Sequence, residues 1–248
     1  DLTLSQNVLD TDSMTLDIND VNEAPTVSLA NVITTIDENS STETSTKIAD
    51  IEISDDALGI NELSLAGADA DNFVIVELDD GSYELHLKAG VDLDFETLSS
   101  MDVTVEVSDA SLSDSPLDTD SMTLDVVDVN EAPTAADNKL VINEDTAYQF
   151  TPADFGFDDV DAGDTLDSIK ITALPIEGIL YFNGEAIESL AEGGLDISAE
   201  DIGKLTYKGG EHESGTDYAS FEFQVNDGEL LSDTQTIQLD IAPVADVV

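Results

Sequence analysis

The sequence predicts an all-β protein built from tandem Greek-key β-sandwich domains, and two observations support this. The first is an internal repeat: LDTDSMTLD at residues 9–17 and DVNEAPT at 20–26 return letter for letter at 117–125 and 128–134, an offset of 108 residues. A repeat of that length is one small domain placed in series. The second is that nearly every local signal is a short run of alternating apolar and polar residues, as in half-buried strands.

The repeat sets the expected domain boundaries. Residues 1–26 are expected to be the tail of an upstream repeat plus its linker, and residues 1–20 to lack the strands with which they would pair. Residues 27–133 form a first sandwich that ends in the linker 128–133, residues 134–242 form a second, and 243–248 start the next linker. Proline ends both linkers and biases the preceding residue toward extended conformations, so the linkers are predicted to be stiff.

The local signals follow in chain order. Strands are expected at TLDI (15–18), KIADIEI (47–53), FVIVEL (73–78), YELHLKA (83–89), VTVEV (103–107), MTLDVV (122–127), KLVI (139–142), SIKIT (168–172), ILYF (179–182), KLTY (204–207), FEFQV (221–225) and TIQLDI (236–241). Asp80-Gly81 and Asn183-Gly184 predict type I′ hairpin turns, because both dipeptides tolerate positive φ. Only two brief helical turns are expected, near Asp69 and at Ser198.

Composition narrows the class of function. The 248 residues include 57 Asp and Glu against 6 Lys and Arg, a formal net charge of -51. Such a chain repels nucleic acid and anionic lipid, and it needs counter-ions such as divalent cations. A disordered acidic tail is disfavoured because 41% of the residues are apolar and they alternate along the expected strands. The chain has no Cys, so no disulfide stabilises it.

The first full domain contains five acidic motifs, which follow one another in this order: IDENS at 36–40, the segment 53–73 that begins ISDD, LDFET at 93–97, VEVSD at 105–109 and DVNEAP at 128–133. In this order the domain resembles a bacterial cadherin-like repeat over residues 27–133. The second domain resembles the related repeats of large secreted calcium-dependent (RTX-type) adhesins. The resemblance implies calcium-binding extracellular modules joined end to end as a rod, secreted by a signal outside this sequence, for cell adhesion and biofilm formation.

The resemblance also implies the calcium ligands, because calcium takes six to eight oxygens that must converge from several loops. The central junction would use residues of the first domain, the linker and the second domain: Glu38, Asp94, Glu96, Asp128, Asn130, Glu131, Asp159, Asp161 and Asp227. The upstream junction would use Asp20, Asn22, Glu23, Asp55, Asp56, Asn61 and Asp109. Glu144 is the counterpart of Glu38 at a downstream site, which is expected to be incomplete because the linker there reads APVAD.

Several acidic and histidine residues also admit roles other than calcium ligation. Asp159, Asp161 and Asp164 could form a solvated loop, and Asp69 and Asp71 are expected at a helical turn rather than on a metal. His86 is expected on the solvated face of its strand, and His212 in a polar loop has no Cys or His neighbour, so neither supports a zinc site. No pair of carboxylates is set apart for catalysis, and we expect no enzyme activity.

Two non-enzymatic functions remain. In the first, the domains are extenders whose junctions are stiffened by calcium, with neighbouring repeats of the same polypeptide as partners. In the second, a domain binds a polysaccharide or a partner cadherin-like domain. The sequence has no Trp to form a sugar-stacking platform. Phe73, Phe221 and Phe223 are expected in the core, whereas the sequence does not place Tyr181, Tyr207 or Tyr218.

Overall fold

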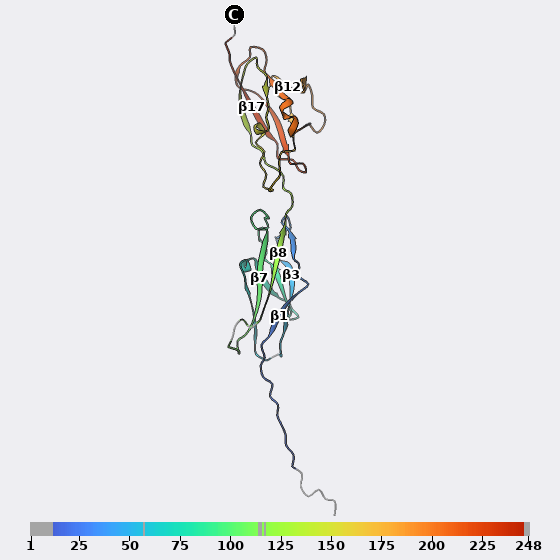
Figure 1. The fold of residues 1–248 in the computed structure, drawn as a ribbon, viewed down its shortest axis with the longest axis vertical. Coiled ribbons are helices and arrows are strands. Elements are labelled where there is room, and N and C mark those ends of the chain that lie inside the picture. The colour runs from blue at the N-terminus through green and yellow to red at the C-terminus, as the bar shows by residue number, and fades with distance from the viewer. Residues whose placement is uncertain (1–11, 57, 114–115, 117, 246–248) are drawn as a thin grey trace, which may run out of the picture. The chain divides into compact units, whose positions relative to one another are not determined.

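The computed structural model describes residues 12–56, 58–113, 116 and 118–245 (Figure 1). The chain divides into two compact units, unit 1 (Asp1–Val127) and unit 2 (Asp128–Val248), which group the linker 128–133 with the second unit. Each unit is a sandwich of two β-sheets, and helix is limited to three 3-10 turns among the described residues. The predicted all-β sandwich fold is therefore confirmed. No helix in the described part of the chain is long and apolar enough to cross a membrane.

Unit 1 contains two four-stranded sheets, with strand orders β1-β3-β6-β5 and β2-β8-β7-β4. Strands β7 and β8 run side by side (Figure 1) as a long antiparallel pair, and β2 pairs with β8 in parallel. The elements are β1 Thr26–Ala30, β2 Thr35–Asp37, β3 Thr46–Ser54, β4 Asn61–Ala66, η1 Ala70–Asn72, β5 Phe73–Glu77, β6 Tyr83–Leu87, β7 Ser100–Asp109 and β8 Asp118–Val127.

Unit 2 contains a five-stranded sheet of order β14-β11-β16-β17-β9 and a four-stranded sheet of order β10-β15-β12-β13. Its last strand, β17, pairs in parallel with β9, as β8 pairs with β2 in unit 1. The elements are β9 Asn138–Asn143, β10 Tyr148–Gln149, η2 Pro152–Phe155, β11 Ser168–Ala173, β12 Ile179–Phe182, β13 Glu185–Ala186, β14 Leu195–Ser198, η3 Ala199–Lys204, β15 Leu205–Lys208, β16 Gly215–Asn226 and β17 Gln235–Ala242.

The strand alternation read in the sequence builds both cores. Every second residue of β7, from Met101 to Val107, is at most 1% exposed and faces the opposite sheet. In unit 2 the aromatic side chains meet edge to face, with ring centroids 5.5 Å apart for Phe150 and Phe221 and 5.0 Å apart for Phe155 and Phe223. Phe73, Phe221 and Phe223 are buried as predicted. Such burial supplies most of the stability of a chain without disulfides.

Carboxylates close one edge of unit 1. Strand β1 lies at the edge of its sheet, and its Val27 and Leu29 N–H groups donate to the side chains of Asp118 (2.9 Å) and Asp120 (2.7 Å) on β8. An unpaired strand edge is a site of unwanted association, and these carboxylates occupy donors that a foreign strand would otherwise use. The acidic composition therefore takes part in the fold itself.

One local prediction was wrong. In the β5–β6 connection Gly81 alone has positive φ, and the Leu78 carbonyl accepts from the Gly81 N–H (2.9 Å), so the turn is not type I′. Asn183 and Gly184 do both have positive φ, as predicted. The strand signal at 15–18 forms no strand, as expected for residues that lack the strands with which they would pair, and the expectation for residues 1–11 lies outside the described residues.

Met14, Leu16 and Ile18 are 89%, 75% and 87% exposed, although the same repeat positions in β8 (Met122, Leu124 and Val126) are 9%, 0% and 3% exposed. Position within a complete sandwich, rather than local sequence, decides this difference.

The repeat offers a matched test of this statement. Leu124→Ala opens a cavity in the core of unit 1 and is expected to cost about 2–5 kcal/mol. Leu16→Ala, within the same nine-residue string, is expected to change stability by less than about 0.5 kcal/mol. Urea unfolding of both variants measures the two effects. Equal losses would show that residues 12–18 are packed like β8.

Candidate metal centres

The leading end of each unit is the end at which a linker runs into its first strand. At the leading end of unit 1 the linker residue Asn22 donates its side-chain amide to Asp109 Oδ2 (2.7 Å) and to Ser111 Oγ (2.6 Å). Asp109 ends β7 and is 1% exposed, and its Oδ1 accepts from the Ser111 N–H (2.8 Å). The Asn22 amide and the Ser111 N–H together hold the pKa of Asp109 at about 2. A charged carboxylate is thus fixed beside the linker.

Gly59 makes room for this carboxylate. Its φ is +81°, and a side-chain carbon at this position would lie 2.0 Å from Asp109 Oδ2. Only glycine combines that backbone conformation with the absence of a side chain. The sequence analysis missed both Gly59 and Ser111. Ser111 follows Asp109 by two residues, a spacing typical of a short side-chain turn that could have indicated it.

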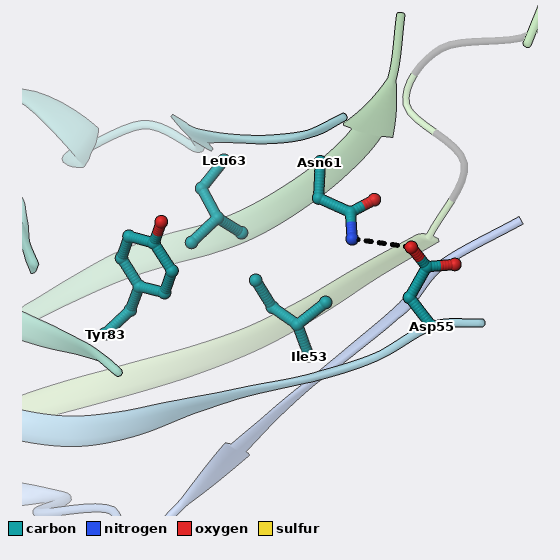
Figure 2. A pocket seen from close by; sticks show the side chains of 5 residues that line it. All are labelled: Ile53, Asp55, Asn61, Leu63 and Tyr83. Carbon is teal, nitrogen blue, oxygen red and sulfur yellow. Dashed lines mark hydrogen bonds between the residues drawn. The ribbon is translucent and has the colours of Figure 1, made fainter. Parts of the chain in front are cut away.

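Three oxygen atoms at this end have no donor. Asn61 donates its amide to Asp55 Oδ2 (2.8 Å), and in Figure 2 the remaining oxygens of both side chains lie on the side away from Tyr83. Asp55 Oδ1, Asn61 Oδ1 and Asn22 Oδ1 are buried and accept no hydrogen bond from the described residues. Buried acceptors without donors are costly, so these oxygens need either a hydrogen-bond donor such as water or a cation.

A pocket adjoins the side chains of Asp55 and Asn61. A pocket of about 370 Å³ is lined by Ile53, Asp55, Asn61, Leu63 and Tyr83 (Figure 2). Its apolar side chains come from the two facing sheets, while Asp55 and Asn61 supply the polar rim. The oxygens of Asp55 and Asn61 that accept no hydrogen bond from the described residues therefore lie at the rim of this pocket.

Asp20, Glu23 and Asp56 form a second carboxylate group at the leading end of unit 1. One oxygen of each lies within 4.8 Å of the others, and the Glu23 N–H donates to Asp56 Oδ2 (3.2 Å). A hydrogen bond with the Asp56 carboxylate raises the pKa of Glu23, whereas the Leu58 N–H and then Glu23 lower the pKa of Asp56. The shift on Glu23 means that this carboxyl holds its proton more readily beside Asp56 than it would alone.

The leading end of unit 2 repeats this design. Linker residue Asn130 donates its amide to Asp227 Oδ2 (3.2 Å), as Asn22 does to Asp109, and the Glu131 N–H donates to Asp161 Oδ2 (2.9 Å), as Glu23 does to Asp56. Partial burial acts to raise the pKa of Asp227. The N–H groups of Glu229 and Leu230, with the Asn130 amide, nevertheless hold that pKa below its ordinary value. The predicted correspondence of Asp109 with Asp227 is present in the geometry.

Three carboxylates converge beside this linker. Asp159, Asp161 and Asp164 each place an oxygen within 4.8 Å of the others. Asp161 is 9% exposed, and its Oδ1 and Asp159 Oδ2 are buried without a donor among the described residues. Burial raises the pKa of Asp164, and the charges of Asp159 and Asp161 raise it further. The cluster is unfavourable for anions alone and suited to a cation.

The trailing end of unit 1, where β8 leaves the domain, also holds a group of carboxylates. Glu38, Asp94 and Glu96 bring their oxygens within 4.8 Å of one another. Glu38 is 7% exposed and accepts from the Phe95 N–H (2.7 Å), which fixes the loop of Asp94 against it. These are three residues that the sequence resemblance assigned to calcium.

The remaining candidates are placed as follows. Asp128 is exposed in the linker. Glu144 is 7% exposed and belongs to none of the acidic groups found among the described residues. Asp69 caps η1 and accepts from the Asp102 N–H (2.8 Å), a structural role. His86 lies 2.7 Å from Glu84 on the face of β6, in a network with Lys47.

The ligand set fits a hard cation. Every candidate offers carboxylate or amide oxygen, and the described residues place no His or Cys in these groups. In Asp55, Asp159 and Asp161 one carboxylate oxygen accepts an N–H, and the other is buried without a donor among the described residues. Oxygen-only sites built from acidic loops suit calcium rather than zinc.

Comparison with known proteins agrees with this architecture. Residues 130–240 match the family described as Bacterial Ig domain. The chain is similar in structure to the protocadherin Gamma B2 extracellular cadherin domains 1-5 (TM-score 0.58, 20% identity, 93% of this chain and 42% of that one). It is also similar to the protocadherin GammaB4 extracellular domain (TM-score 0.56, 19% identity, 89% of this chain and 33% of that one). The fold is the cadherin/Ig-like β-sandwich.

These similarities have a defined extent. The chain spans about a third to a half of the length of solved protocadherin structures that it matches. At about 20% identity they establish the fold and leave the function to the residues of this chain. No curated protein matches the sequence.

Acid should weaken the leading end of unit 1. The folded-state pKa of Asp109, about 2, lies below its ordinary 3.8. Asp109 therefore contributes stability that is present above about pH 4 and is lost as the pH falls toward 2. In chelator-treated protein the difference in unfolding free energy between the native chain and Asp109→Asn should shrink over this range. Chemical unfolding at a series of pH values measures it, and a constant difference would contradict the assignment.

Proposed function

We propose that the chain consists of calcium-binding extender repeats of a large extracellular bacterial adhesin. Calcium ions bound at the ends of the domains hold each linker and stiffen the junction, so that the repeats extend an adhesive tip from the cell surface in adhesion or biofilm formation. The observation that carries this proposal is the set of buried oxygens without donors at Asn22, Asp55, Asn61, Asp159 and Asp161. The match to a bacterial Ig domain supports an extracellular location.

The linkers supply the mechanical argument. Both carry the order Asp, Asn, Glu before a proline, and Pro25 and Pro133 are buried against their units. The Asn amide and the Glu N–H attach each linker to the unit that follows. An ion that binds linker and domain oxygens together stabilises only the ordered junction, by an amount that grows with its occupancy. Removing the ion leaves clustered like charges that repel one another.

A sugar-binding function receives less support. Polysaccharide sites commonly use exposed aromatic rings, whereas the rings of unit 2 are mostly in its core. Tyr207 is fully buried and donates its hydroxyl to the Glu177 carbonyl (2.9 Å). Tyr218 is half-buried and bonds to Glu213. We propose a structural role without catalysis.

Removing calcium should leave both sandwiches folded but free the units to swing. The two core clusters consist of hydrophobic residues, whereas the proposed junction depends on the acidic groups. Small-angle scattering with calcium and with chelator measures the change, which we expect as a shift from one extended particle to a bent ensemble. Identical extended profiles in both conditions would refute the stiffening role.

Asp161→Asn should lower calcium affinity at least tenfold. The substitution keeps the shape and the acceptor for Glu131 but removes the charge that faces Asp159 and Asp164. Asp196→Asn is the matched control, because Asp196 is exposed on β14 of the same unit. Calorimetric titration of both variants tests the site. Equal affinities would mean that the Asp159 cluster is solvated charge.

A further inference from the structure

Glu38 and Glu144 occupy equivalent places in the two units. Each follows the strand that pairs in parallel with the last strand of its sandwich. The Glu38 N–H donates to the Val127 carbonyl (3.1 Å), and the Glu144 N–H donates to the Ala242 carbonyl (2.9 Å). Both side chains are 7% exposed. From their positions alone, the two carboxylates are expected to have the same role at the trailing ends of their units.

Their surroundings differ. The β6–β7 loop brings Asp94 and Glu96 to Glu38. The corresponding β15–β16 loop reads GGEHES. The His212 N–H donates to Asp145 Oδ1 (3.2 Å), and Glu213 accepts from the Tyr218 hydroxyl. Within the described residues, Glu144 belongs to no group of three or more potential metal ligands.

The chain that leaves each unit differs as well. After β8 the linker reads Asp128-Val129-Asn130, with a carboxylate and an amide. After β17 the same three places are taken by Pro243-Val244-Ala245, which offer no side-chain oxygen. The Val244 N–H donates to Glu144 Oε1 at 2.7 Å. Hydrogen bonds to an ionised acceptor are among the strong ones.

We infer that Glu144 is a positioning residue: it fixes the departing chain through the Val244 N–H, and the trailing end of unit 2 holds its geometry without calcium. At this end of unit 2 a buried carboxylate does by a hydrogen bond what the ion is proposed to do at the trailing end of unit 1. This inference rests on the proposed calcium function only for its contrast with Glu38. The Glu144–Val244 hydrogen bond itself requires no metal.

Three variants of the full chain test the inference. Glu144→Gln keeps an acceptor for Val244 and removes the charge, Glu144→Ala removes both, and Glu38→Gln is the control at the equivalent position. In chelator-treated protein, Glu144→Ala should speed hydrogen exchange of the Val244 amide roughly tenfold or more, because its hydrogen bond is lost. Glu144→Gln should change it much less. Calcium calorimetry should be unaltered by both Glu144 variants and weakened by Glu38→Gln.

The outcomes separate the two proposals. If Glu144→Gln weakens calcium binding, or if Glu144→Ala leaves Val244 exchange unchanged, the positioning role is wrong. If Glu38→Gln leaves calcium binding unaltered as well, the proposed calcium function fails at unit 1, while the exchange result still decides the role of Glu144.

Discussion

The structure depends on how a chain with 57 acidic and 6 basic residues satisfies its carboxylates. Six basic residues cannot form ion pairs with most of the carboxylates, and backbone N–H groups donate hydrogen bonds to many of the others. Asp118 and Asp120 close the edge of β1, and Asp154 caps η2 through the Thr151 N–H. A backbone N–H can satisfy one oxygen of a carboxylate and leave the other for a cation. At Asp161 one oxygen accepts from Glu131 and the other has no donor.

This division of labour couples fold to function. At each leading end a linker asparagine amide and a linker glutamate N–H donate to domain carboxylates, so the same hydrogen bonds direct the linker and orient the oxygens. The recurrence of Asn22 with Asp109 and of Asn130 with Asp227 shows one solution used in both units. Under the proposed function, a cation at such a place binds the linker and the domain together, and its occupancy sets how firmly the linker is held.

The domain boundaries and the linker residues were predictable because two strings of the sequence return letter for letter after 108 residues. The β8 core positions follow from alternation, and the linker triads follow from their place beside proline. The local sequence around Leu16 and Leu124 is identical, so only the repeat boundaries, which leave residues 1–20 without partner strands, indicate that Leu16 is exposed while Leu124 is buried. The sequence does not indicate Gly59, whose importance lies in its close approach to Asp109, nor the hydrogen bond from the Val244 N–H to Glu144.

The central claim is that cations complete these acidic ends, and calorimetric titration of calcium into the chelator-treated chain tests it most directly. The account predicts several saturable sites, with scattering collected before and after the titration changing from a bent ensemble to one extended particle. Absent or unsaturable binding would contradict it, and would mean that the buried oxygens at Asp55, Asn61, Asp159 and Asp161 are satisfied by water alone.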